Sequence, residues 1–366
     1  MSLLPWQTSP ENYEQLFAQK CARVEKDMQF GSLPPAQRFS SPSQSYRVRA
    51  EFRIWHDEDD LNYVMFDPES PRTPVIIREF VPALEPIRQL MPRLREYLKL
   101  RPTLRRKLFQ AEFMATTTGE LLVTLIYHRA LDDAWEEEAT TLAEAFGVSL
   151  VGRSRKQKRV IGHDFVTDEF VVNGRIYSYR QYEQSFVQPN APVNQKMLNW
   201  AWEQSAHCGG DLLELYCGNG NFTLPLASQF PQVIATELSK SGTRAALENL
   251  SANHIENVEV VRLSAEEVSQ AMAGVREFRR LASLPKALGD YDLRTVFVDP
   301  PRAGLDPATL DCVRQFEAII YVSCNLQTLK ANIHALESTH SVASFALFDQ
   351  FPYTHHIESA VVLRRS

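Results

Sequence analysis

The second half of the sequence alternates short apolar segments with segments of helical character, and this alternation restricts the fold more than any other feature. Five apolar segments rich in aliphatic and β-branched residues span 211–216, 232–236, 258–263, 294–298 and 318–323. Strands that alternate with helices are typical of βαβ units, whose strands lie parallel in one sheet. Two more strand-like segments, 344–349 and 358–365, follow with no helix between them. The pattern predicts an α/β domain with a mainly parallel sheet.

The first half has a different pattern. Its strand-like segments are 46–55, 61–67, 74–80, 109–116 and 120–128, and helical spacing occurs at 82–99 and 133–146. The Asn173-Gly174 pair between two strand-like segments indicates a two-residue hairpin turn. A helix then begins near Asn190, with Pro192 in its first turn, where the missing N–H costs nothing. We therefore expect an α+β domain at 1–185 and the α/β domain at 186–366.

Composition is that of a soluble globular protein, with 44% hydrophobic and 23% charged residues. No apolar run approaches the roughly 18 residues of a membrane-spanning helix. The first residues lack the basic and apolar regions of a secretory signal, so we expect a cytoplasmic protein without membrane attachment. The net charge of −6 argues against bulk attraction to nucleic acid but leaves room for a local basic face.

The cysteines indicate free thiols rather than a disulfide framework. There are five, an odd number, at positions 21, 208, 217, 312 and 324. No CxxC pair and no His/Cys cluster with the spacing of zinc ligands is present in the sequence. We expect no bound metal and no iron–sulfur cluster.

Polar residues follow the predicted parallel strands, and the carboxyl ends of parallel strands meet at one edge of a sheet. Glycine turn 217–221 follows the first strand, Glu237 the second, Asp299 the fourth and Cys324 the fifth. A glycine turn allows close approach of a ligand to the backbone, and an acidic residue after the second strand accepts hydrogen bonds from ribose hydroxyls. The third glycine of the dinucleotide motif is replaced by Thr223. A nucleoside without phosphates, such as S-adenosylmethionine, is therefore favoured over a dinucleotide, and an ordinary capped turn is the alternative.

The remaining residues at strand ends could have either a structural or a chemical role. A cysteine at a strand end is usually an inert packing residue, but the polar neighbours of Cys324 favour an exposed thiol able to ionise. Asp299 precedes two prolines that stiffen its turn. Glu358 ends the aromatic-rich segment 348–358, where burial would raise its pKa and suit it to act as a general base.

These segments also carry a family resemblance. DPPRAG at 299–304, YVSCNLQT at 321–328 and FDQFPYTHHIE at 348–358 resemble the tRNA (uracil-5-)-methyltransferase family, as do QPN at 188–190 and ELYCGNGNF at 214–222. The resemblance extends along nearly the whole chain. It implies a Rossmann-like, class I S-adenosylmethionine-dependent methyltransferase domain preceded by an α+β RNA-binding domain.

The resemblance also implies roles for individual residues. Cys324 would be the nucleophile and Glu358 the proton acceptor of methylation at C5 of a T-loop uridine in tRNA, or in a tRNA-like RNA such as tmRNA. The positions that match cofactor-binding residues are Gln188, Tyr216, Gly218, Asn221, Glu237 and Asp299. The candidates for RNA contacts are Arg53, Phe109, His128 and Arg302. The family usually has proline where this chain has Leu326.

Several alternatives stay open at this point. Ribosomal-RNA relatives often carry a four-cysteine iron–sulfur site, and a single cysteine before residue 208 favours the tRNA branch. Cytosine C5 methylation uses the same thiolate chemistry, and an RNA-binding or tRNA-folding module with incidental activity is a further possibility. We expect the T-arm of tRNA as partner and no obligate protein partner. Basic residues at 101–107 and 153–159 either bind RNA or form solvated faces.

Overall fold

The computed structural model describes residues 4, 6–28, 33–58 and 60–366, and the chain forms two compact units. The larger unit contains residues 12–41, 170–179 and 192–366. The smaller unit contains residues 1–11, 42–169 and 180–191. Each unit is built around its own sheet, and we describe the two separately. Among the described residues, no helix combines the length and the apolar character needed to cross a membrane.

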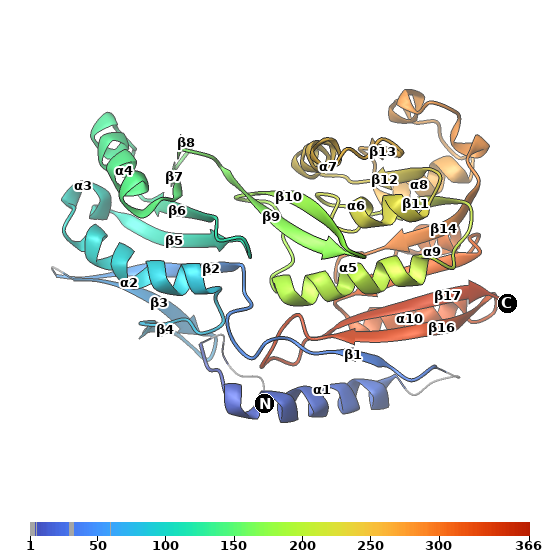
Figure 1. Cartoon of the computed structure of the whole chain (residues 1–366), viewed down its shortest axis with the longest axis horizontal. Coiled ribbons are helices and arrows are strands. Elements are labelled where there is room, and N and C mark those ends of the chain that lie inside the picture. The colour runs from blue at the N-terminus through green and yellow to red at the C-terminus, as the bar shows by residue number, and fades with distance from the viewer. Residues whose placement is uncertain (1–3, 5, 29–32, 59) are drawn as a thin grey trace. The chain divides into compact units, whose positions relative to one another are not determined.

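The larger unit is an eight-stranded sheet with the order β1-β16-β17-β15-β14-β11-β12-β13 (Figure 1). Its strands are β1 (Gln37–Phe39), β11 (Asp211–Leu215), β12 (Val233–Thr236), β13 (Val258–Val261), β14 (Leu293–Val298), β15 (Ala318–Ser323), β16 (His340–Phe348) and β17 (Glu358–Arg365). Strands β13, β12, β11, β14 and β15 are mutually parallel, whereas β17 is antiparallel to both neighbours. All seven strands predicted in this half are confirmed.

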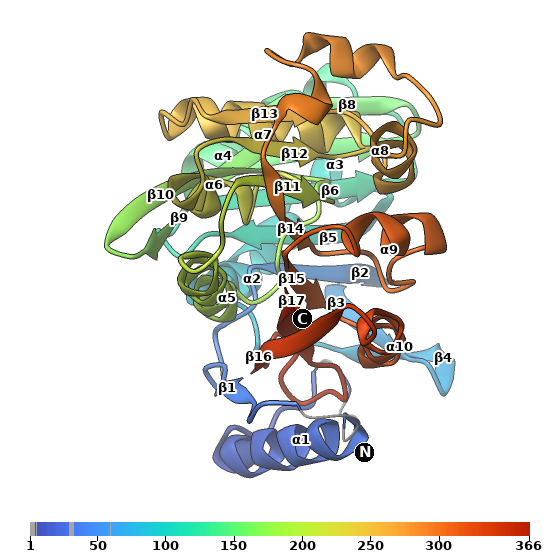
Figure 2. The same cartoon turned by 90° about the vertical axis from the view of Figure 1, so that its right-hand side faces the viewer.

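Burial explains why these strands read as continuous apolar segments. Every residue of β11 and β15 is buried. The covering helices are α5 (Ala191–Ser205), α6 (Thr223–Leu226), α7 (Lys240–Ala252), α8 (Ala265–Met272), α9 (Pro307–Val313) and α10 (Leu326–Leu336). Figure 2 shows α5 on one side of the sheet and α8, α9 and α10 on the other. A sheet covered on both faces needs apolar side chains on both, as parallel sheets generally do.

The N-terminal segment of the chain belongs to the larger unit, which differs from the simple division expected at 185/186. Helix α1 (Tyr13–Asp27) is followed by β1, which pairs in parallel with β16 at the sheet edge (Figures 1 and 2). The tip of the hairpin formed by β9 (Phe165–Val172) and β10 (Arg175–Tyr182) also groups with this unit. The grouping differs from that division because pairing between β1 and β16 joins segments that are distant in sequence.

The smaller unit has a seven-stranded sheet with the order β4-β3-β2-β5-β6-β7-β8. Its strands are β2 (Arg49–Asp57), β3 (Asp60–Asp67), β4 (Ser70–Ile76), β5 (Leu108–Ala115), β6 (Leu121–Tyr127), β7 (Ser149–Ser154) and β8 (Gln157–Ile161). Its helices are α2 (Glu85–Lys99), α3 (Pro102–Arg105) and α4 (Asp133–Phe146). The predicted antiparallel character is confirmed except at β6 and β7, which run parallel on either side of α4. The Asn173-Gly174 turn is confirmed, with positive φ at both residues.

Candidate active site

The candidate residues of the larger unit gather at one edge of its sheet because they follow parallel strands. Glu237 follows β12, Asp299 follows β14 and Cys324 follows β15, and these strands are joined through β11 in one parallel ladder. The strand order reverses between β11 and β14, which is where open α/β sheets bind ligands. The predicted convergence of strand ends is therefore present.

Cys324 lies in the short connection between β15 and α10, which is held by hydrogen bonds of Asn325. Asn325 caps the helix, its side-chain oxygen accepting from the Gln327 N–H at 3.1 Å, while its Nδ2 donates to the Arg302 carbonyl at 2.8 Å. The second bond joins the turn after β14 to the turn after β15. Leu326 is the first residue of α10, a position that suits proline but leaves its N–H without an intrahelical partner in any case. The departure from the family pattern therefore removes no helix hydrogen bond.

A cavity of about 450 Å³ opens at the Cys324 thiol. Its lining comes from four segments of the larger unit: Arg23, Val24 and Asp27 of α1, Arg302, residues 324–327, and residues 355–357. The thiol is half-buried rather than exposed as expected, because the loop before β17 and helix α1 help to enclose it. Two arginines and two histidines thus surround the candidate nucleophile.

Glu358 is the first residue of β17 and lies opposite Phe348 at the end of β16. Its side chain is only 4% exposed. Burial raises the pKa of Glu358 well above its ordinary value, the Asp299 carboxylate adds to this, and the Arg302 guanidinium opposes it. The direction of the predicted pKa shift is confirmed, and its main cause is the predicted desolvation.

The thiol responds to the same charges. Burial raises the pKa of Cys324, Glu358 and Asp299 raise it further, and Arg302 lowers it. Asp299 is partly exposed, and desolvation raises its pKa as well. Arg302 therefore favours the charged forms of both Cys324 and Glu358, whereas burial and the neighbouring carboxylates favour the neutral forms.

The glycine turn after β11 has the backbone of a ligand-binding loop. Tyr216, Gly218 and Gly220 all have positive φ, at 64°, 58° and 86°. A Cβ on Gly218 would meet nothing within 4 Å, so the space above this residue is open. Tyr216 is a non-glycine residue held in the left-handed region, which is uncommon and is often found at functional sites. Its phenol has a pKa raised to about 12, chiefly by burial.

Glu237 faces this turn. Its carboxylate accepts from the Gly218 N–H at 3.1 Å and from the Ser239 N–H at 2.6 Å. Gly242 of α7 makes room for the side chain, since a Cβ there would lie 2.9 Å from Glu237 Cγ and 3.2 Å from the Gly218 carbonyl oxygen. The half-buried carboxylate is thus fixed at the strand end, next to the open turn.

Two further cofactor candidates have different surroundings. Asn221 exchanges side-chain hydrogen bonds of 3.0 Å in both directions with Asn194 of α5, and its carbonyl accepts from the Tyr179 hydroxyl. Sequence reasoning did not single out Asn194, which carries no motif of its own. Gln188 lies in the smaller unit, so its part in the site stays a prediction.

The RNA candidates of the smaller unit form one stack. The Arg53 guanidinium lies 3.9 Å from the centre of the Phe109 ring, and the Phe109 and His128 rings stack at 4.0 Å. Arg53 is on β2, Phe109 on the adjacent β5, and His128 directly follows β6. Arg53 and His128 are exposed and Phe109 is half-buried. A cation beside stacked rings at the surface suits an unstacked base.

The residues present fit a nucleoside cofactor in the larger unit. The open glycine turn and the fixed Glu237 carboxylate match the needs of a ribose, and among the described residues Asp299 makes no hydrogen bond that would occupy its carboxylate. Within the same residues, no group of three or more His, Cys, Asp or Glu side chains could hold a metal ion.

Comparison with solved structures agrees with this architecture. The crystal structure of Pyrococcus abyssi tRNA (uracil-54, C5)-methyltransferase in complex with S-adenosyl-L-homocysteine superposes with a TM-score of 0.73, at 20% identity, covering 96% of this chain and 83% of that one. The likeness confirms the predicted fold, in which the larger unit has the class I, Rossmann-like architecture of methyltransferase domains.

Sequence comparison identifies the family. The model of the tRNA (uracil-5-)-methyltransferase family matches residues 12–366. A tRNA/tmRNA (uracil-C(5))-methyltransferase of Dechloromonas aromatica is 52% identical over 357 residues, covering 97% of this chain and 98% of the relative. One of Pseudoalteromonas atlantica, with the same name, is 48% identical and covers 99% of each chain. The chain belongs to the tRNA (uracil-5-)-methyltransferase family.

Proposed function

We propose that the protein transfers a methyl group from S-adenosylmethionine to C5 of the T-loop uridine of tRNA, which becomes ribothymidine. The names of its relatives add tmRNA, a tRNA-like RNA, as a second substrate. The observation that carries the proposal is the placement of a half-buried thiol and a buried carboxyl, Cys324 and Glu358, at the same edge of the catalytic sheet. Family membership selects uracil over cytosine.

The chemistry needs both groups because C5 of uracil is a poor nucleophile. Addition of the Cys324 sulfur to C6 forms an S–C6 bond and gives C5 the character of an enolate carbon. S-adenosylmethionine, when bound, supplies an electrophilic methyl group to that carbon. Glu358 then accepts the C5 proton, the electron pair of the C5–H bond restores the C5–C6 double bond, and the S–C6 bond breaks. Cys324 leaves as the thiolate.

The raised pKa of Glu358 suits this role. A carboxylate whose pKa is raised binds a proton more strongly than an ordinary glutamate, so it is a better base for the C5 proton. Arg302 would stabilise the thiolate of Cys324. Together with Asp299, it would also orient the edge of the target uracil. Gly218, Glu237, Tyr216 and Asn221 would hold the cofactor, and the family match adds Gln188.

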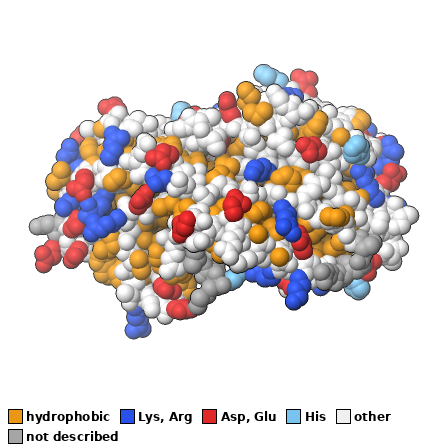
Figure 3. Space-filling view, turned by 60° about the horizontal axis from the view of Figure 1, so that its bottom comes forward, with side chains coloured by type: hydrophobic (Ala, Val, Ile, Leu, Met, Phe, Trp, Pro, Cys, Tyr) orange, Lys and Arg blue, Asp and Glu red, His pale blue; other side chains and the backbone are white. Residues whose placement is uncertain are grey.

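Two arginines in the lining of the cavity support an RNA substrate. Arg23 and Arg302 line the space next to Cys324, together with His355 and His356, whose pKa values are lowered by burial. A stacked uracil hides C5 and C6, so the target nucleotide must leave its loop and bring its backbone phosphates with it. On the face in Figure 3, basic and acidic side chains are interspersed. Local groups such as these, rather than net charge, would then attract the RNA.

Two substitutions test the mechanism because they should fail differently. Cys324→Ala cannot form the bond to C6, so neither methylated tRNA nor a covalent protein–RNA complex should form. Glu358→Gln retains the thiol, so attack and methyl transfer proceed while proton removal is slowed by about 10²–10⁴-fold, the usual worth of a general base. A methylated, denaturation-resistant protein–RNA complex should accumulate and migrate as a shifted band. Normal turnover by Glu358→Gln, or an adduct with Cys324→Ala, would contradict the assignment.

The substrate is tested with three RNAs and the wild-type protein. Full tRNA and an isolated T-arm hairpin should both yield 5-methyluridine, whereas the same hairpin with cytidine at the target position should yield no methylated nucleoside. Mass analysis of the digested RNA distinguishes the products. Formation of 5-methylcytidine would favour the cytosine alternative, and a T-arm that is not methylated would show that recognition needs the rest of the tRNA.

A further inference from the structure

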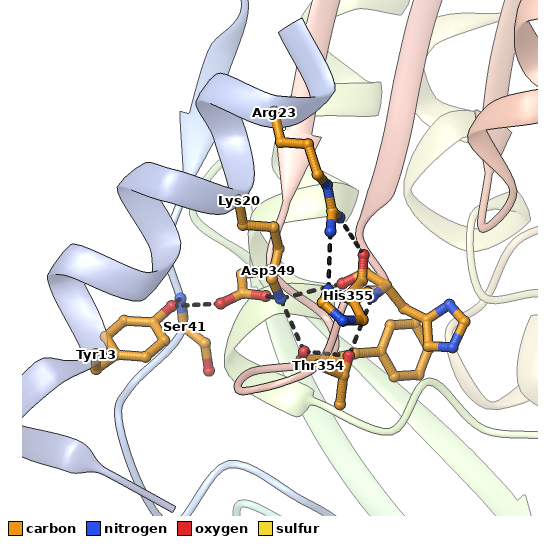
Figure 4. Close-up of polar contacts among 9 residues, drawn as sticks. Tyr13, Lys20, Arg23, Ser41, Asp349, Thr354 and His355 are labelled. Atoms are coloured by element: carbon orange, nitrogen blue, oxygen red, sulfur yellow. Dashed lines mark hydrogen bonds and ion pairs between the residues drawn. The ribbon is translucent and has the colours of Figure 1, made fainter. Parts of the chain in front are cut away.

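A buried lysine of the N-terminal helix contacts the loop that carries Glu358. Lys20 of α1 is 7% exposed, and its ammonium group makes three contacts with residues 349–357, the loop between β16 and β17 (Figure 4). It pairs with Asp349 Oδ1 at 2.6 Å and donates to the carbonyls of Phe351 at 2.9 Å and His356 at 3.1 Å. One side chain thus spans the loop from its first residue to within two residues of Glu358.

Asp349 extends the same network. It is 1% exposed, and its second carboxylate oxygen accepts from the Tyr13 hydroxyl at 2.8 Å. The Tyr13 oxygen in turn accepts from the Ser41 N–H at 2.6 Å, just beyond β1 (Figure 4). Arg23, one turn after Lys20, donates to the His355 carbonyl at 2.7 Å. Helix α1 therefore contacts the loop both near its β16 end and near its β17 end.

Burial of the Lys20–Asp349 ion pair needs an explanation beyond stability, and the explanation we consider is that the pair fixes the conformation of the 349–357 loop. Removing two charges from water is unfavourable, and a well-packed apolar pair of similar volume is often as stable as a buried ion pair. A hairpin between two antiparallel strands does not need a residue from the start of the chain to close. What Lys20 adds is a fixed path for the loop, whose last residue leads directly into Glu358.

We propose that Lys20 is a positioning residue for Glu358, which it acts on through its bonds to Asp349 and to the carbonyls of Phe351 and His356. The proposal rests on the function proposed above, in which Glu358 removes the C5 proton. Without Lys20, β16 and β17 still form a hairpin, but the loop between them loses the three bonds from the lysine that fix its conformation. Glu358 then departs from the geometry of proton transfer, and a displacement of about 1 Å can cost roughly 10²-fold in rate.

The test compares Lys20→Met, Asp349→Asn and the double variant. Each single variant leaves one buried charge without its partner, so a loss of activity could reflect reduced stability alone. The double variant removes both charges, and its melting temperature should recover toward wild type. The amide oxygen that Asp349→Asn introduces can still accept from Tyr13, but the bonds from Lys20 to the two carbonyls remain absent. The double variant therefore separates positioning from stability.

We expect the double variant to keep wild-type affinity for S-adenosylmethionine while its kcat falls about 10²-fold. It should accumulate the methylated covalent protein–RNA complex, because the step that Glu358 performs is the one impaired. A purely structural role would reduce the amount of active protein and slow every step equally, without accumulation of the complex. Tyr13→Phe, which removes one hydroxyl, should show the same complex at a lower level.

Lys330→Met is the matched control. Lys330 of α10 donates to the Asp27 carbonyl at 2.8 Å, and this bond ties α10, rather than the 349–357 loop, to α1. The variant should turn over normally. Wild-type kcat in the folded double variant would overturn the proposal while leaving the role of Glu358 intact. Normal turnover by Glu358→Gln would instead overturn the base assignment, and this inference with it.

Discussion

The two units hold their candidate residues by different means. In the larger unit, Glu237, Asp299 and Cys324 each follow a parallel strand, so the sheet fixes where they lie. In the smaller unit, Arg53 and Phe109 lie on adjacent strands and interact through their side chains. Groups that take part in bond making need positions set by the backbone, whereas recognition of a flexible RNA loop can use exposed side chains that adapt. The contrast predicts that substitution of Glu237 alters cofactor binding, whereas substitution of Arg53 or Phe109 alters RNA binding.

We expect the largest difference between the effects on cofactor binding and on tRNA binding when Glu237 is replaced. Glu237→Ala should weaken S-adenosylmethionine binding by about 1.5–3 kcal/mol, the range of a hydrogen bond to a charged group. Affinity for tRNA, measured without cofactor, should stay unchanged. Calorimetry with Glu256→Ala, an exposed acidic residue of the same unit, provides the control. Equal loss in both variants would show that Glu237 acts only through net charge.

Phe109→Ala should have the opposite profile. Loss of a stacking ring typically weakens single-stranded nucleic-acid binding by about 1–3 kcal/mol per base. We expect weaker tRNA binding in a filter or gel-shift assay and unchanged cofactor affinity. Arg53→Gln, which removes the cation beside the ring, should weaken binding less. If cofactor affinity falls together with tRNA affinity, the two units are not functionally separate.

A smaller effect, on the salt dependence of tRNA binding, should distinguish the basic segments 101–107 and 153–159 of the smaller unit. Neutralising Arg105, Arg106 and Lys107 should flatten the salt dependence of tRNA binding, by a slope of about 0.7–0.9 per lost phosphate contact. The matched triple replaces cations that already have acidic partners: Arg153 pairs with Glu183, Lys158 with Asp164 and Arg159 with Asp133. That triple should leave the slope unchanged. Equal slopes for both triples would remove the first segment from the interface.

The smallest expected effect is a shift in the pH dependence of Cys324 alkylation, followed by mass spectrometry of its peptide. Glu358 raises the pKa of the thiol and Arg302 lowers it. Because the thiolate is the reactive form, Glu358→Gln should move the profile to lower pH and Arg302→Gln should move it to higher pH. Arg53→Gln in the smaller unit should leave it in place. Shifts in the same direction for both active-site variants would contradict the charge arrangement.

Much of the fold was predictable because the parallel strands are buried on both faces and separated by helices. The edge of the sheet that carries Cys324 followed from strand direction alone. The role of α1 did not follow. Its buried residues Tyr13, Phe17, Cys21 and Val24 have helical spacing, so the helix itself could have been found. Its partner could not, because nothing in the spacing of residues near the start of a chain reveals pairing with the last strands.

The same limit explains which site residues were missed. Lys20 has the pattern of an ordinary helix lysine, and its partners, Asp349 and two backbone carbonyls, lie more than 300 residues further along the chain. The half-buried state of Cys324 depends on α1 in the same way. Local sequence predicted the thiol chemistry of Cys324 but no role for Lys20, because only tertiary contacts determine how far each side chain is removed from water.

The pairing of β1 with β16 has a consequence for how the protein forms during translation. The two strands are separated by about 300 residues, so the first segment leaves the ribosome long before its partner exists. At about 5–20 residues per second, that wait is on the order of 15–60 s. During it the apolar face of α1 has no native surface to cover it, and such exposure is what chaperones recognise. The smaller unit, whose strands are all complete earlier, can meanwhile fold, so the sheet that carries the chemistry closes after the smaller unit has been made.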